Sequence, residues 1–329
     1  MDNKGFRILS VDGGGYRGVF AANVLKKIEV LYENFDWRKE FNLMAGTSTG
    51  SIIVAALATG KKATEIATFY DGYGEKIFPK KNFWQRCFNP CGIRKKRYDS
   101  SILKGLLEKT FGNITLGQID YPLFIPATNI ETGNVFVMKT NYGKFDRDKD
   151  IRLVDAILAS CAAPTYFKPH EMGDYFLADG GLWANNPALM AMIEAKFRLG
   201  QDINKVKVLS IGTGRRVKKY TRTDNPVDCR WGAVTWGIGM LELILNLQSV
   251  HTENMINLLF GDGRSSPNVL RIDFSNNSNI PLDQPKYQKE LAGLASEAVT
   301  YASDSIHQFF EDHISPKPNQ TIIKELEND

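Results

Sequence analysis

Apolar residues along the chain occur in two alternating patterns. Segment 6–11 (FRILSV) is a short apolar run that leads into glycines, whereas segment 19–32 has apolar residues at helical spacing. The first pattern is typical of a buried strand and the second of an amphipathic helix. The same alternation predicts further strands at 41–45, 122–130, 134–140, 175–179, 206–214 and 268–274, and helices at 51–60, 99–112, 153–160, 187–200 and 234–250.

Strands that alternate with helices in this way indicate an α/β protein. We expect a three-layer α/β/α fold with a mostly parallel central sheet that helices cover on both faces. No linker rich in proline, glycine or serine divides the sequence. Residues 1–315 are therefore expected to form a single domain, and 316–329 a polar C-terminal tail.

A serine stands between a predicted strand and a predicted helix, in Gly46-Thr47-Ser48-Thr49-Gly50. Glycines two positions before and after it fit a nucleophile elbow, where strand and helix nearly touch and the central residue is strained. Such a turn exposes the serine hydroxyl and points the helix N-terminus at it. A plain turn that caps a helix is the alternative, and the five residues alone leave both open.

Glycines also follow the first strand, in Asp12-Gly13-Gly14-Gly15-Tyr16-Arg17-Gly18. This spacing also occurs in dinucleotide-binding turns, but these need an acidic residue after the next strand, where this chain has the serine elbow. Successive glycine N–H groups suit an oxyanion hole, which we assign to Gly13, Gly14 and Gly15. Arg17 and Gly18 would support the loop.

A carboxylate ends a third strand, in Asp179-Gly180-Gly181. Asp179 would act as the general base for Ser48, with Asn185 and Asn186 bracing its loop; an ordinary Asp-Gly turn is the alternative. A Ser-Asp-His triad would need a histidine later in the chain, and His251 has that order. His251 directly follows the predicted helix 234–250 and is expected to continue it rather than lie in a late loop, which favours a Ser48–Asp179 dyad.

Together the three motifs resemble the patatin-like phospholipase family. The segments SCAAPTYFKP (160–169) and NNP (185–187) also match the family pattern, and the resemblance extends over about 6–211. It implies hydrolysis of acyl esters in phospholipids or other lipids, with Ser48 as nucleophile, Asp179 as its dyad partner and the glycine amides as oxyanion hole. It implies neither a metal nor another cofactor.

Composition narrows the setting of this activity. The chain is 43% hydrophobic with a net charge of +4, which does not indicate a DNA or RNA polymer as partner. Four cysteines are too few for a disulfide framework, and no apolar run has the length of a signal peptide or membrane span. We expect a cytoplasmic protein that is peripheral to the inner membrane when active.

Two basic segments are candidate contacts for an anionic activator or a membrane surface. Segment 79–98 has seven basic and no acidic residues and includes Arg94, Lys95, Lys96 and Arg97, and a second cluster begins at Arg215 and Arg216. Solvated loops are the alternative.

The layout also resembles bacterial patatin-like enzymes that a cyclic oligonucleotide activates in anti-phage defence, which implies such an activator here. A nucleotide-binding sensor on an inactive hydrolase fold is the rival function. The nearly all-apolar helix at 234–250 is expected in the core, with a lipid-facing mouth or a homo-oligomer interface left open.

Overall fold

An eight-stranded sheet forms the centre of the protein. The structure is a computed structural model that describes residues 5–79, 98–215, 233–260, 268–275, 277 and 280–311. The strand order is β5-β6-β3-β2-β1-β7-β8, and β4 also pairs with β3. The strands are β1 (Phe6–Val11), β2 (Leu43–Gly46), β3 (Leu123–Asn129), β4 (Asn134–Lys139), β5 (His170–Met172), β6 (Tyr175–Asp179), β7 (Val206–Ile211) and β8 (Val269–Ile272).

Most of this sheet is parallel. Strands β3, β2, β1, β7 and β8 run in one direction, and Ile8 of β1 lies opposite Leu43 on one side and Val208 on the other. Strands β4 and β6 are antiparallel to β3, and β5 is antiparallel to β6. The carboxyl ends of β1 and β2 therefore meet at one edge of the sheet, where the glycine loop and the serine turn begin.

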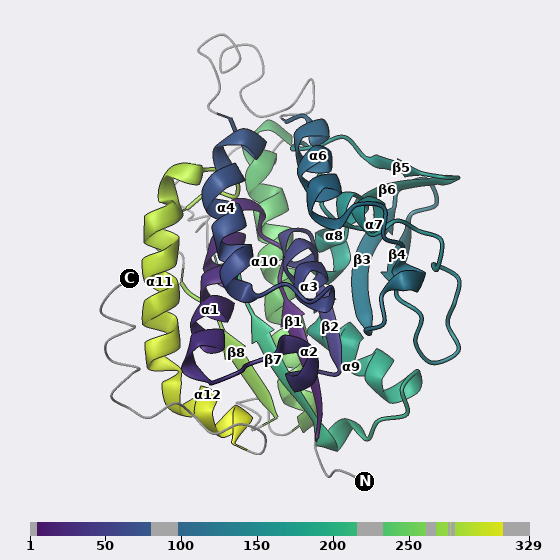
Figure 1. The fold of residues 1–329 in the computed structure, drawn as a ribbon. Coiled ribbons are helices and arrows are strands. Elements are labelled where there is room, and N and C mark those ends of the chain that lie inside the picture. Colours follow the sequence, from purple (N-terminus) through teal and green to yellow (C-terminus); the bar gives the residue numbers. More distant parts are fainter. Residues whose placement is uncertain are drawn as a thin grey trace.

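Helices lie on both faces of the sheet (Figure 1). Successive strand residues face opposite sides, so Leu9 packs in the core with α1, α3 and α11, whereas Ile8 packs in the core with α9. The predicted α/β/α fold with a mostly parallel sheet is confirmed. The helices are α1 (Gly18–Leu31), α2 (Trp37–Glu40), α3 (Thr49–Ala58), α4 (Ala63–Ile77), α6 (Ser100–Phe111), α7 (Leu153–Ser160), α8 (Gly181–Ala184), α9 (Ala188–Phe197), α10 (Ala233–Phe260), α11 (Gln288–Tyr301) and α12 (Ser303–Phe310).

Several helices differ from the sequence-based expectation. Helix α10 continues to Phe260, ten residues past the predicted end at 250, and α4, α11 and α12 were not predicted. Helix α11 buries only the narrow stripe Leu291, Ala295 and Val299. Such a stripe is a weak periodic signal, and packing against α1 supplies the rest of the stability. The single domain over 1–315 stays a prediction, and the predicted tail at 316–329 lies outside the described residues.

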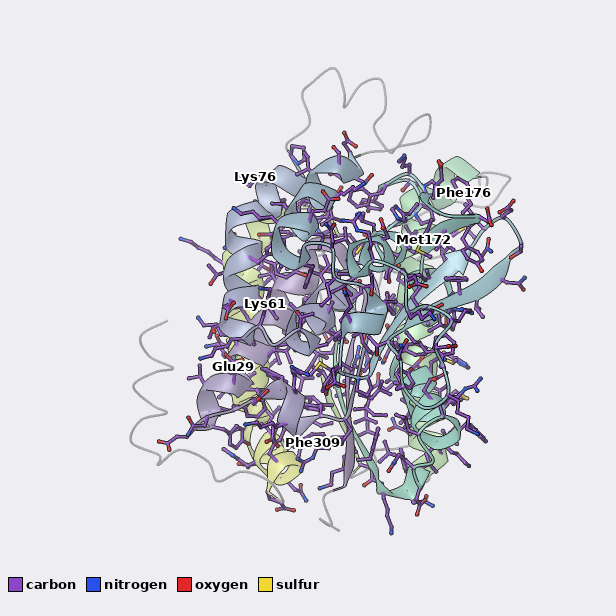
Figure 2. All side chains as sticks on the ribbon, turned by 45° about the vertical axis from the view of Figure 1, so that its right-hand side comes forward. Glu29, Lys61, Lys76, Met172, Phe176 and Phe309 are labelled. Atoms are coloured by element: carbon purple, nitrogen blue, oxygen red, sulfur yellow. The ribbon has the colours of Figure 1, made fainter. Side chains whose placement is uncertain are left out.

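The C-terminal helix α12 is fixed to the first strand through Arg7. The Arg7 side chain is 1% exposed, donates to the Phe309 carbonyl at 3.1 Å and pairs with Glu40 at 3.5 Å. Its guanidinium also lies over the ring of Phe310, at 5.5 Å from the ring centroid. Figure 2 shows Phe309 near the bottom of the view, at the end of the molecule opposite Lys76.

Candidate active site

Ser48 forms the turn between β2 and α3. Its backbone has φ 52° and ψ −122°, which is rare for a residue other than glycine and costs about 1–3 kcal/mol. The turn is also crowded, because a Cβ atom on Gly50 would overlap the Val11 carbonyl and one on Gly46 would overlap the Gly50 carbonyl. The chain therefore has the elbow geometry that the sequence predicts, with the N-terminus of α3 directed at the serine.

Two hydroxyl groups tie this turn to neighbouring elements. The Ser48 N–H donates to Oγ of Ser160 at 2.9 Å, and the Ser160 hydroxyl donates to the Pro126 carbonyl at 2.7 Å. Thr47 donates to the Ala184 carbonyl at 2.6 Å. Sequence reasoning missed Ser160, whose one signal was its place at the start of the family-like segment 160–169.

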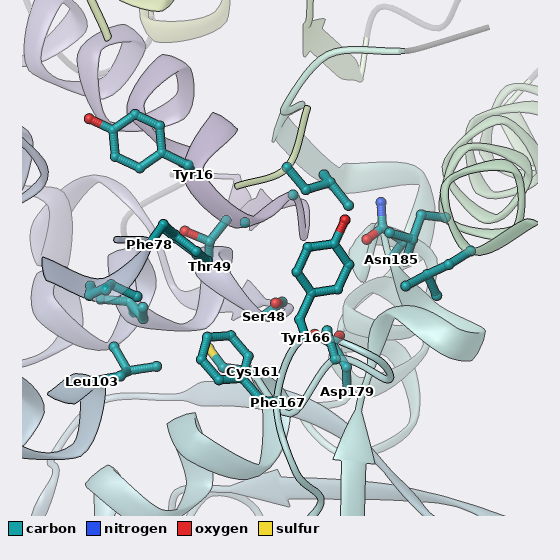
Figure 3. A pocket seen from close by; sticks show the side chains of 18 of the residues that line it. Tyr16, Ser48, Thr49, Phe78, Leu103, Cys161, Tyr166, Phe167, Asp179 and Asn185 are labelled. Carbon is teal, nitrogen blue, oxygen red and sulfur yellow. The ribbon is translucent and has the colours of Figure 1, made fainter. Parts of the chain in front are cut away.

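Asp179 ends β6 beside the elbow. Its carboxylate is 5% exposed, and Oδ1 accepts the Gly181 N–H at 2.7 Å. Burial raises the pKa of Asp179 to about 6, although the Gly181 N–H and a hydrogen bond with the Ser48 side chain lower it in part. Figure 3 shows Ser48 and Asp179 at the same cavity. A carboxylate with this pKa is a suitable general base near neutral pH.

Two residues of the glycine loop lie at the same cavity. Gly14 and Gly15 line it together with Ser48, and in the described structure neither N–H donates to a protein acceptor. Gly15 has φ 57°, and a Cβ atom there would overlap the Leu282 carbonyl, so the loop needs glycine at this position. Both N–H groups are therefore placed to bind a developing negative charge.

Gly13 differs from its predicted place in the oxyanion hole. Its N–H donates to the Asn185 carbonyl at 3.0 Å, and its carbonyl accepts the Thr213 hydroxyl at 2.6 Å. An N–H that is already bonded is not free to bind an oxyanion. Gly13 thus anchors the loop, and the donor set reduces to Gly14 and Gly15.

Asparagines brace the loop that follows Asp179, as the sequence predicts. The Asn185 side chain donates to Oγ of Ser249 at 2.9 Å. The Asn186 side chain accepts the Ser10 hydroxyl at 3.3 Å and the Ala188 N–H at 3.0 Å. This joins the loop to α10, β1 and α9.

The other predicted supporting residues lie close to these turns. Arg17 is buried and lines a small polar cavity with Asp12 and Asn185 behind the glycine loop. Gly18 packs against Thr49 at the start of α3, and Gly180 packs against the Pro126 carbonyl. The structure thus brings the residues of all three motifs to one edge of the sheet.

A buried ion-pair network behind the glycine loop was not predicted. The two terminal nitrogens of the Arg271 guanidinium, Nη1 and Nη2, donate to the Asp12 carboxylate at 2.8 and 2.7 Å, and Nη2 also donates to Asp273 at 2.8 Å. Ser249 donates to the same Asp12 carboxylate at 2.9 Å. Asp273 in turn accepts the Gly214 N–H at 2.8 Å. Because Asp12 is the residue before Gly13, this network fixes the base of the loop from β8 and α10.

The cavity in front of the loop is mostly apolar. About 890 Å³ of space free of protein atoms lies here, a figure that includes open solvent at the mouth of the cavity. Beyond the site residues, its walls include Phe78, Leu103, Tyr166, Phe167, Leu241 and Leu245. A hydrocarbon group can therefore lie next to Ser48 without leaving polar groups unpaired.

No histidine of the described residues lines this cavity. His251 is exposed on α10, His170 pairs with Asp155 at 3.2 Å, and His307 contacts Tyr32. A triad through His251 thus has no support in the arrangement of the site.

The residues predicted to contact an activator are mostly outside the described structure. This holds for Arg94, Lys95, Lys96, Arg97 and Arg216. Arg215 is described, and its guanidinium pairs with Glu253 and, at 3.3 Å, with Asp273. An anion at Arg215 would therefore have to compete with two carboxylates. Through Asp273, Arg215 also forms the outer end of the buried network.

An apolar cavity with one activated hydroxyl, one basic carboxylate and free N–H donors suits an ester with a hydrocarbon part. The class that this fold and site define is therefore an α/β acyl hydrolase of lipid esters. The family model of patatin-like phospholipases matches residues 9–192. The chain belongs to the patatin-like phospholipase family, whose members are lipid acyl hydrolases.

Known relatives come from bacteria and plants. A cGAMP-activated phospholipase of Escherichia coli is 36% identical over 228 residues, which cover 65% of this chain and 63% of that protein, less than two thirds of its length. One from Vibrio cholerae is 33% identical over 301 residues, covering 84% and 82%. Patatin-like protein 1 of Arabidopsis thaliana is 30% identical over 265 residues, covering 70% and 63%.

Within the described ranges, every helix falls short of the length and apolar character needed to cross a bilayer.

Removing one side of the Asp12–Arg271 pair should destabilise the protein. We expect Arg271→Met to lower the free energy of unfolding by about 3–5 kcal/mol, because it leaves a buried carboxylate unpaired. Urea unfolding measures the change. Arg152→Met is the control at a partly exposed arginine. It breaks the contacts with Glu108 at 3.4 Å, Asp155 at 3.8 Å and Asn113 at 3.0 Å, and should cost no more than about 1 kcal/mol. Equal losses of unfolding free energy in the two variants would contradict the larger stabilisation that we expect from the Asp12–Arg271 pair.

Replacing Asp179 should stabilise the protein above its pKa. The folded pKa of about 6 exceeds the usual carboxyl pKa of 3.8, so the native state holds the proton more tightly and loses stability as pH rises from about 4 to 6. Asp179→Asn removes that buried charge and should gain up to about 3 kcal/mol at about pH 8, and less at about pH 5.

Thermal unfolding at both pH values tests this expectation. Asp155→Asn is the control of opposite sign, because its hydrogen bond with His170 holds the pKa of Asp155 below its usual value. That variant should lose stability near neutral pH. A gain from Asp179→Asn that is independent of pH would show that charge burial is not its cause.

Proposed function

We propose that this protein is a serine acyl hydrolase that cleaves acyl esters of membrane phospholipid. Ser48 is the nucleophile, Asp179 the general base, and the N–H groups of Gly14 and Gly15 form the oxyanion hole. The observation that supports this most is the single apolar cavity that holds the strained serine, a carboxylate with a pKa of about 6 and two free donors.

The first half of the reaction forms an acyl-enzyme. Asp179 takes the hydroxyl proton as Oγ of Ser48 attacks the ester carbonyl. The carbonyl oxygen gains negative charge and binds the N–H groups of Gly14 and Gly15, a contribution of about 10²–10³ in rate for each donor. The tetrahedral intermediate then collapses, the bond to the alcohol oxygen breaks, and Asp179 returns its proton to that oxygen.

The second half repeats these steps with water. Asp179 removes a proton from the water that attacks the acyl-enzyme, and the same donors bind the oxyanion. Collapse releases the fatty acid and returns the proton to Oγ of Ser48. One carboxylate thus acts as base and acid in turn, which a pKa close to neutrality favours.

We also place this activity at the cytoplasmic face of the inner membrane. The long acyl chains of phospholipid match the apolar walls of the cavity, and the basic and aromatic residues of segment 79–98 suit a surface with anionic lipid. The homo-oligomer that the sequence leaves open stays a prediction.

Control by a cyclic dinucleotide is the finer part of the proposal. Three of the matched bacterial relatives are called cGAMP-activated phospholipases, at 36, 33 and 30% identity. An enzyme that degrades the membrane of its own cell needs an off state, and a ligand that prefers the active state can supply the switch. By the same likeness we assign the protein to antiviral defence. The complete serine and aspartate pair argues against a sensor on an inactive hydrolase fold.

Loss of either member of the dyad should abolish ester hydrolysis. We expect Ser48→Ala and Asp179→Ala to be inactive on p-nitrophenyl butyrate, and the double variant to be little worse than either, because the pair acts as one unit. His251→Ala should keep most of the activity. Inactivity of a folded His251→Ala variant would replace the dyad by a triad.

Activation should depend on the basic cluster that follows β7. We expect cGAMP to stimulate hydrolysis of phosphatidylglycerol and phosphatidylethanolamine vesicles. Arg216→Glu should raise the half-activating cGAMP concentration on the order of tenfold, because a charge-assisted hydrogen bond is lost. Lys149→Glu makes the same charge reversal at an exposed turn outside the basic cluster, and as the control it should leave that concentration unchanged. Full vesicle hydrolysis without cGAMP, unaltered by adding it, would leave a constitutive lipase.

A further inference from the structure

A groove between α3, α4 and α6 has no part in the mechanism above. It has about 970 Å³ of empty space and is open to solvent. Its floor is apolar and includes Ile52, Ala56, Ile66, Phe69, Leu107 and Phe111. Its polar residues include Lys61, Thr68, Lys109 and Thr110, all of which are at least partly exposed.

Three helices continue from the Ser48 cavity into this groove. Along α3, Ile52 and Ala56 follow Ser48 at intervals of one helical turn, and Ile52 lines both spaces. Ala56 therefore lies about 12 Å from Ser48 along the helix axis, eight residues at about 1.5 Å each. This row leads directly away from the serine.

The other two helices follow the same course. Leu103 of α6 lines the cavity, and Leu107 and Phe111 line the groove one and two turns later. Helix α4 runs the opposite way, with Tyr70 at the cavity and Ile66 in the groove. Figure 2 shows Lys76 and Lys61 at the two ends of this helix, and Lys61 marks the end of the groove farther from the site. The groove is thus an axial continuation of the cavity.

Two side chains belong to the lining of both spaces, Ile52 and Phe69. Ile52 is buried, whereas Phe69 is half-buried. These two side chains therefore lie at the boundary between the cavity and the groove.

We infer that this groove binds the distal part of the acyl chain whose carbonyl lies at Ser48. The inference rests on the proposed function, because it places the ester at that serine. A hydrocarbon chain needs no hydrogen-bond partner, which fits the apolar floor, and each methylene that leaves water favours binding about fourfold. The groove therefore sets the preference of the enzyme for long acyl chains.

Filling the groove with a larger side chain tests the inference. We expect Ala56→Phe to lower the ratio of kcat/KM on p-nitrophenyl palmitate to that on p-nitrophenyl butyrate by about tenfold or more, as if about two methylenes no longer left water. Ala56 is buried, so Thr110→Phe serves as a second variant that fills the groove from its edge. It should lower the same ratio.

A matched control lies on α11. Thr110 donates to the carbonyl four residues earlier at 2.8 Å, and Thr300 does the same at 2.9 Å on an exposed helix face. Thr300→Phe makes the same chemical change away from the groove and should leave the palmitate-to-butyrate ratio unchanged. A fall of the ratio in this control equal to that in Thr110→Phe would overturn the assignment.

A binding measurement separates the groove from the proposed function. Displacement of fluorescent cis-parinaric acid by palmitate should be tight in the unmodified protein and weaker in both groove variants, whether or not esters are cleaved. If p-nitrophenyl butyrate is not hydrolysed and a fluorophosphonate does not label Ser48, the proposed function is refuted but the groove is not. An unchanged palmitate-to-butyrate ratio or unchanged palmitate binding in both groove variants would refute the groove.

Discussion

The close contact between β1, β2 and the start of α3 is the constraint on which the site depends. The Val11 carbonyl and Gly50 are so near that no side chain fits between them, and every residue of α3 is buried. A helix buried on all sides must begin immediately at the edge of the sheet, which leaves Ser48 with a positive φ. Packing of α3 offsets that strain of about 1–3 kcal/mol, and the same closeness brings the glycine loop beside the serine.

Two buried carboxylates at this edge show how a partner decides chemistry. Asp12 follows β1 and Asp179 ends β6, and both are at most 5% exposed. Burial raises the pKa of Asp12 as well, but the Arg271 charge opposes that rise, and the two terminal guanidinium nitrogens of Arg271 hold the carboxyl in place. In the described part of the chain, Asp179 has no ion pair with a cation, and burial raises its pKa to about 6. The first carboxylate positions the loop, while the second can exchange a proton.

Helix α10 connects regions that are distant in the sequence. Leu241 and Leu245 line the cavity, Ser249 binds Asp12 and Asn185, and Glu253 pairs with Arg215. These positions follow one another at nearly one-turn spacing, so they share one face of the helix. The opposite face exposes Met240 and Leu247, at 50% and 55%. A rigid helix that contacts the cavity, the loop anchor and Arg215 is suited to couple them, because any displacement would move all three contacts together.

The sequence by itself determined the local parts of this protein. Glycines around Ser48, the glycine loop and Asp179 specify turns through steric rules that act over a few residues, so the elbow, the loop and the α/β alternation were predictable. Helix α11 was not predicted, because its narrow apolar stripe gains stability only from packing on α1.

Only the tertiary structure decided which groups meet. It assigned the Gly13 N–H to Asn185, joined Asp12 to Arg271 across 259 positions, and placed Ser160 under the elbow. It also lined a groove with three helices that lie apart in the chain. Hydrogen bonds and burial depend on distances in space, and spacing along a chain does not set those distances for residues on different elements. The pKa of Asp179 is therefore a property of the fold.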